Sequence, residues 1–187
     1  MFSYSHGEHS LLFHSRRSTM FKRSNLIYFL CVFTISSVSL VYASGQEQAN
    51  LAQMKKFYTE VVNKGNYELM DQLCTPDFIE HEELPGVEQN LDGVKQFFKM
   101  YRAAFPDLKF EIEQMFAKDD KVVTYITITG THKGEFMGNP ATGNRINMKG
   151  IDIVRFVGGK AAEHWGVTDT MTMMNQIGAI PGEAHHK

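Results

Sequence analysis

The spacing of apolar residues changes once along this chain, near Pro106, and that change limits the folds available to it. Before Pro106, apolar side chains recur every three or four residues, which is typical of amphipathic helices. The predicted helices are 46–64, 67–74 and 92–105. From Leu108 onward, apolar and polar residues alternate, which is typical of strands with one buried face. The predicted strands start at 108, 122, 145 and 160, and a short helix follows at 170–177.

Helices followed by strands predict an α+β fold. We expect a curved antiparallel sheet wrapped around the three N-terminal helices, because only these helices can cover its apolar face. Such a sheet forms a cone with an open mouth, where a hydrophobic small molecule can bind. The segment 76–90, between the second and third helices, is predicted to be irregular.

The N-terminal segment has the pattern of a secretory signal peptide. Basic residues precede an apolar run at 26–42, and small residues follow it at Ala43 and Ser44. We therefore expect a signal peptide at 1–43, a single domain at 44–187, and a secreted or periplasmic location. An uncleaved membrane anchor is the alternative, since the run is long enough to span a bilayer. Met20 is an alternative start.

The charge of the predicted mature chain excludes some partners. The leader holds four of the 19 basic residues and one of the 21 acidic ones, which leaves 15 and 20. This acidic balance argues against nucleic acid and anionic membrane surfaces as partners. Cys74 is the only cysteine beyond the leader, so no disulfide within the mature chain is expected.

Sequence motifs for metals, phosphates and nucleophiles were not found. His81, His132 and His164 are far apart, and no pair of them has the spacing of helical metal ligands. No glycine-rich phosphate loop precedes a helix, and no nucleophile elbow is present. The sequence therefore predicts neither a metal nor a cofactor, and acid–base chemistry is the class that remains.

The hairpin at 150–169 contains the candidate acids. Its second strand places Glu163, Trp165 and Asp169 on one face, which we expect to be an apolar wall. Burial there would raise the pKa of Asp169, and a nearby Asp152 would raise it further, which suits proton transfer from carbon. Two alternatives stay open: Asp169 can cap the helix that follows, and Asp152 can form a hydrogen bond to a neighbouring strand or a salt bridge with Arg145 or Lys149.

Several segments together resemble the SnoaL-like polyketide cyclase family of the nuclear transport factor 2-like superfamily. The resemblance covers about 51–178 and rests on FYTEVVNKGNYELMDQLCTPDFIEHE, AAFPDL, GTHKGEFMGNPATG, GIDIVRF and GGKAAEHWGVTD. It implies the cone-shaped α+β barrel of that superfamily. It also implies ring closure without a cofactor, by intramolecular aldol addition on a polyketide ester.

The resemblance also implies roles for individual residues. Asp169 matches the family's general acid/base, and His81 and Asp152 match its helper positions. The residues expected to shape the substrate pocket are Trp165, His132, Glu163, Phe97 and Tyr101.

Two other functions remain possible at this point. The chain can be an exported domain that binds a hydrophobic small molecule without reacting it, or a structural dimer module whose pocket has filled in. A homodimer is expected in any case, through the strand face that carries Tyr125, Thr127 and Thr129. An Asp169 enclosed in a cavity beside His81 or Asp152 would favour the enzyme.

Overall fold

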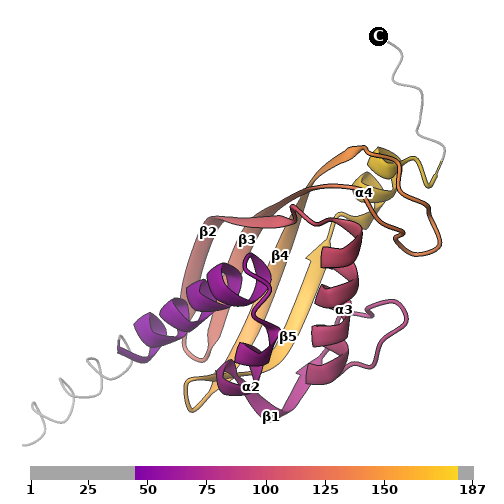
Figure 1. Ribbon diagram of the computed structural model, residues 1–187. Coiled ribbons are helices and arrows are strands. Elements are labelled where there is room, and N and C mark those ends of the chain that lie inside the picture. Colours follow the sequence, from indigo (N-terminus) through magenta and orange to yellow (C-terminus); the bar gives the residue numbers. More distant parts are fainter. Residues whose placement is uncertain (1–44, 181–187) are drawn as a thin grey trace, which may run out of the picture. The chain divides into compact units, whose positions relative to one another are not determined.

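A computed structural model describes residues 45–180, which form an α+β domain (Figure 1). The first helix covers 45–56 and continues as a π-helical turn, η1 (Phe57–Val62). The other helices are η2 (Tyr67–Leu69), α2 (Met70–Leu73), α3 (Leu91–Ala104) and α4 (Thr170–Ile177). The strands are β1 (Cys74–Glu80), β2 (Lys109–Lys118), β3 (Lys121–Thr131), β4 (Arg145–Val157) and β5 (Lys160–Thr168).

The five strands form one sheet in the order β1-β5-β4-β3-β2. The first helix, α2 and α3 lie over one face of this sheet (Figure 1). The predicted fold class is therefore confirmed, with three N-terminal helical segments on a sheet built mainly from the C-terminal half. The predicted signal peptide, residues 1–43, lies outside the described residues. None of the helices within 45–180 is both long and apolar enough to cross a bilayer.

One strand was not expected, and it changes the sheet from antiparallel to mixed. Residues 74–80 were assigned to the end of a helix and to an irregular segment, but they form β1, which pairs in parallel with β5. Pro76 lacks an N–H group, and a strand at the edge of a sheet tolerates this because only one of its sides is paired. The register shifts between Cys74 and Ile79.

Helix ends follow the local sequence. The side chain of Asn90 accepts a hydrogen bond of 2.9 Å from the backbone N–H of Gly93, and α3 begins at the next residue, Leu91. The helix ends at Ala104, shortly before Pro106. Its aromatic residues face the sheet, so α3 and the strands bury a shared apolar core.

Candidate active site

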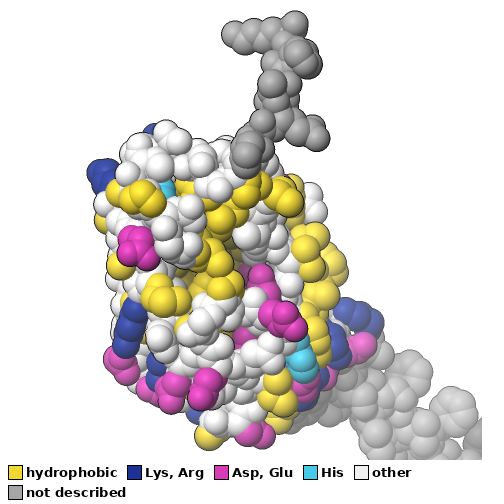
Figure 2. Space-filling model, turned by 90° about the vertical axis from the view of Figure 1, so that its right-hand side faces the viewer, with side chains coloured by type: hydrophobic (Ala, Val, Ile, Leu, Met, Phe, Trp, Pro, Cys, Tyr) yellow, Lys and Arg dark blue, Asp and Glu magenta, His cyan; other side chains and the backbone are white. Residues whose placement is uncertain are grey.

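The helices and the inner face of the sheet enclose a cavity of about 270 Å³. Most of its wall is apolar, with aromatic side chains from the first helix, α3 and β2. Figure 2 shows a hollow in this face, with hydrophobic side chains inside it and acidic side chains beside it. Such a cavity suits a hydrophobic small molecule, and it is not filled by side chains as a purely structural module would require.

Three strands bring polar groups to one part of this wall. Asp152 on β4, His164 on β5 and Glu80 at the end of β1 all line the cavity. The Nδ1 atom of His164 lies 2.8 Å from each carboxylate oxygen of Glu80, and its Nε2 atom lies 3.3 Å from Oδ1 of Asp152. The imidazole is therefore held between two carboxylates.

These carboxylates decide the charge of His164. Burial alone would lower the pKa of His164, but hydrogen bonds and charge interactions with Asp152 and Glu80 outweigh burial and raise it to about 10. The side chain is therefore an imidazolium at neutral pH. Glu80 is only 2% exposed, and this buried carboxylate is compensated by the imidazolium and by the backbone N–H of Glu82, at 2.8 Å.

Asp152 has a second partner from the first helix. The hydroxyl of Tyr58 donates a hydrogen bond to its Oδ2 atom. Burial and the neighbouring Asp152 raise the pKa of Tyr58 well above its usual value, so Tyr58 remains a hydroxyl donor. Asp152 thus accepts on both of its oxygens. The salt bridge to Arg145 or Lys149 considered from the sequence is not formed within residues 45–180, whereas the alternative of a hydrogen bond to a neighbouring strand is met by His164 on β5.

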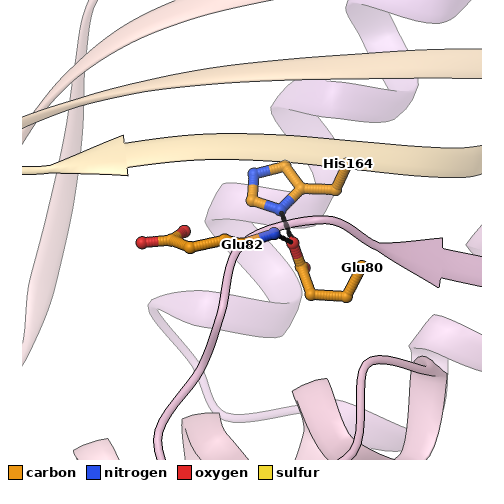
Figure 3. A group of neighbouring side chains, drawn as sticks. All are labelled: Glu80, Glu82 and His164. Carbon is orange, nitrogen blue, oxygen red and sulfur yellow. Dashed lines mark hydrogen bonds and ion pairs between the residues drawn. The ribbon is translucent and has the colours of Figure 1, made fainter.

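Glu82, just beyond β1, adds another carboxyl group to the same wall. Burial raises its pKa, and the charges of Asp152 and Glu80 raise it further, while His164 opposes them. Figure 3 shows Glu80 beneath the His164 ring and the Glu82 carboxyl pointing away from Glu80.

A metal ion is the other group that such residues can hold. Glu80, Glu82 and His164 each offer one ligand atom, and these atoms lie within 4.8 Å of one another. A metal at this position would have to replace the proton on His164 that is shared with Glu80, because a ligating histidine is neutral.

Asp169 does not occupy the position that its expected role requires. The premise that it lies buried in an apolar wall is wrong, because Asp169 is exposed. Its carboxylate accepts a hydrogen bond of 3.0 Å from the backbone N–H of Thr172 at the start of α4. Hydrogen bonds from Thr172 lower its pKa, opposite to the expected direction. The helix-capping alternative describes its geometry, and an Asp169 that only caps α4 favours a binding domain over an enzyme that uses Asp169.

His81, Glu163 and Trp165 lie together, away from the cavity. The His81 ring stacks on Trp165 with centroids 4.5 Å apart, and its Nε2 atom lies 3.0 Å from Oε2 of Glu163. Glu163 also accepts a hydrogen bond of 2.8 Å from Nε of Arg155. This group occupies the outer face of β5, because side chains alternate along a strand and His164 points inward.

The remaining predicted residues divide between the cavity and the core. Phe97 and Tyr101 on α3 line the cavity. His132 is fully buried outside the cavity wall, where its ring packs 5.2 Å from Phe105 and its Nδ1 atom lies 3.1 Å from Oγ1 of Thr142. Of the predicted catalytic residues, only Asp152 lines the cavity; Tyr58, Glu80, Glu82 and His164 were not predicted.

The capping position of Asp169 leads to a prediction. Asp169→Ala should lower Tm by a few degrees, because an uncapped helix terminus leaves backbone N–H groups without a partner. Asp169→Asn keeps a capping oxygen and should leave Tm nearly unchanged. Thermal unfolding of both variants checks this, and equal losses of Tm in the two would contradict the capping role.

Comparisons with known proteins identify relatives that share this fold. The profile of the family described as SnoaL-like polyketide cyclase matches residues 52–177. Nogalonic acid methyl ester cyclase of Streptomyces nogalater is 25% identical over 118 residues, which cover 62% of this chain and 88% of that enzyme.

Two solved structures show how far the similarity extends. TsrD of Streptomyces laurentii superposes with a TM-score of 0.65 at 26% identity, over 71% of this chain and 97% of TsrD. AclR of Streptomyces galilaeus gives a TM-score of 0.63 at 30% identity, over 71% of this chain and 97% of AclR.

Proposed function

Because this chain belongs to the SnoaL-like polyketide cyclase family, we propose that it closes a ring in a hydrophobic polyketide-type ester by intramolecular aldol addition. One observation carries the proposal. The buried array of Asp152, His164 and Glu80 opens onto a cavity whose other walls are mostly apolar. An apolar guest can therefore be held with an enolisable carbonyl group against groups that transfer protons and stabilise charge.

In this proposal Asp152 is the base. Its carboxylate takes a proton from the carbon next to the ester or ketone carbonyl, and the electron pair moves to the carbonyl oxygen as an enolate. The negative charge of Asp152 disappears in that step, so the donors Tyr58 and His164 can turn to the new oxyanion. The enolate carbon then forms a bond with a second carbonyl carbon of the same molecule.

The proposed substrate class rests on the apolar cavity and on the name of one related enzyme. The name of the Streptomyces nogalater enzyme specifies a methyl ester of nogalonic acid, and a methyl ester adds no charge to the guest. We propose an uncharged ester at the reacting end, because a free carboxylate would be repelled by the net negative charge that Asp152, Glu80 and the His164 imidazolium carry together.

The test is turnover on a panel of polyketide methyl esters that includes nogalonic acid methyl ester. Ring closure by aldol addition gives a product of unchanged mass and altered retention. In D2O, deuterium should also enter the carbon next to the carbonyl in substrate whose enolate is reprotonated by solvent before the ring closes. Tight binding with neither ring closure nor deuterium uptake would reject the enzyme and favour a binding domain of the same fold.

We also propose a homodimer formed through the outer face of the sheet. Apolar side chains lie on this face across neighbouring strands, where Ile151 pairs with Val167 and Tyr125. Val167 is 75% exposed and Phe116 on β2 is 58% exposed. A patch of this kind marks a protein interface more often than a free surface.

Val167→Lys should convert the dimer to a monomer, because it places a charge in the middle of an apolar interface. Light scattering coupled to size-exclusion chromatography measures the mass. Met100→Lys, an exposed residue on α3, is the matched control and should leave the dimer intact. A wild-type chain that is monomeric at high micromolar concentration would contradict the proposal.

A further inference from the structure

The carboxyl group of Glu82 lines the cavity and accepts no hydrogen bond from the part of the chain that the structure describes. Its backbone N–H donates to Oε1 of Glu80 at 2.8 Å, and this bond fixes the main chain just beyond β1. Its carboxyl points away from Glu80 (Figure 3). Within residues 45–180, no group donates to that carboxyl, whereas Asp152 accepts on both oxygens.

Gly166 makes the space in which this carboxyl lies. A Cβ atom at position 166 would overlap Oε2 of Glu82 and would lie 2.9 Å from Cε1 of His164. Gly166 pairs with Asp152 across β4 and β5, so the Glu82 carboxyl sits beside Asp152 and His164. Glycine is not required here for a left-handed backbone, because Gly166 is absent from the residues with positive φ. The absence of a side chain at Gly166 is what leaves room for the Glu82 carboxyl.

The carboxyl groups of Glu82 and Asp152 differ in environment. Burial and the charges of Asp152 and Glu80 raise the pKa of Glu82, so it holds a proton more readily than an ordinary glutamate. Asp152 instead receives hydrogen bonds from Tyr58 and His164. Two carboxyl groups in different environments suit a reaction that removes one proton and delivers another.

We propose that Glu82 is a second catalytic residue, the acid that protonates the oxygen formed at ring closure, and that Gly166 seats it. The role rests on the proposed ring closure. Asp152 takes the proton from carbon, the new carbon–carbon bond forms, and the electron pair of the acceptor C=O bond moves to its oxygen. Glu82 gives its proton to that oxygen and becomes a carboxylate. Return of the proton from Asp152 to Glu82 through solvent restores the starting state.

The first experiment separates the two proton transfers. Glu82→Gln should lower ring closure by about 100-fold, the usual scale for a general acid, while deuterium uptake at the carbon acid continues because Asp152 is intact. Glu88→Gln, an exposed acid on the same connection, should match the wild type. Ring closure at the wild-type rate in Glu82→Gln would overturn the proposal, and equal loss of closure and deuterium uptake would overturn the assignment of Glu82 as the acid.

The second experiment moves the carboxyl without removing it. Gly166→Ala should displace the Glu82 side chain, which is flexible, and should also press on Cε1 of His164, so ring closure should fall by a larger factor than deuterium uptake. Full ring closure in a folded Gly166→Ala would overturn the seating role. A wild-type protein that shows neither ring closure nor deuterium uptake would instead reject the proposed function, and the role of Glu82 with it.

Discussion

Asp152→Asn is expected to lower kcat/KM for ring closure by about a thousandfold, within the usual range for loss of a general base. The amide has nearly the same shape but cannot take a proton from carbon. It also removes the charge that, with Glu80, holds His164 as an imidazolium. The side-chain NH2 group of asparagine would face a hydrogen-bond donor, either the Tyr58 hydroxyl or Nε2 of His164, and could not accept its bond. A modest loss of stability therefore accompanies the loss of activity.

The measurement is initial rate together with deuterium uptake, both of which should fall with Asp152→Asn. Asp77→Asn, an exposed aspartate on β1, is the control for the change in net charge. A folded Asp152→Asn with wild-type kcat/KM would remove Asp152 from the mechanism. It would leave the cavity and the family assignment unchanged.

The second large effect is on stability as a function of pH. The folded pKa of His164 is about 10, above the ordinary value of 6.5. A group with a raised folded pKa gives its full stabilisation below the unfolded pKa and loses it as pH rises through the folded pKa. The free energy of unfolding should therefore fall between pH 6.5 and 10, by up to about 1 kcal/mol per pH unit.

Urea unfolding at a series of pH values measures this slope. His164→Gln keeps a polar side chain but cannot be protonated in this range, so its stability should be lower at pH 6.5 and nearly flat up to about pH 8.5. Above that pH, ionisation of the Cys74 thiol in the unfolded chain lowers the stability of both proteins, because burial raises the pKa of Cys74 in the folded chain to about 12. A variant whose stability falls with the same slope as the wild type would show that other groups cause the pH dependence. In that case His164 would not be an imidazolium in the folded chain.

Periodicity predicted most of the elements because each is decided by its own local sequence. The aromatic stripe of α3 and the Gly158-Gly159 turn between β4 and β5 are examples. β1 was missed because Pro76 and the acids that follow are typical of a loop. Its strand conformation depends on pairing with β5, far away in the sequence.

The site was harder to predict because it depends on which face of β5 is buried. Trp165 and Val167 suggested that the odd-numbered face is the inner one, and a shift of one residue exchanges the two faces. The inner face instead carries His164 and Gly166, and Ala161 joins them because the register shifts between Arg155 and Phe156. The absence of a side chain at Gly166 leaves room for Glu82. A histidine two residues before a glycine was the available signal, but its partners could not be identified without the register.

The parallel pairing of β1 with β5 also affects how the chain folds. Glu80 and His164 are 84 positions apart, and their contact requires almost the whole domain to be ordered first. Before the C-terminal hairpin docks, Glu80 and Glu82 are solvated anions on an unpaired segment. A nascent or partly folded chain therefore lacks the assembled array of Asp152, His164 and Glu80, and the proposed chemistry requires β5 to have paired with β1 first.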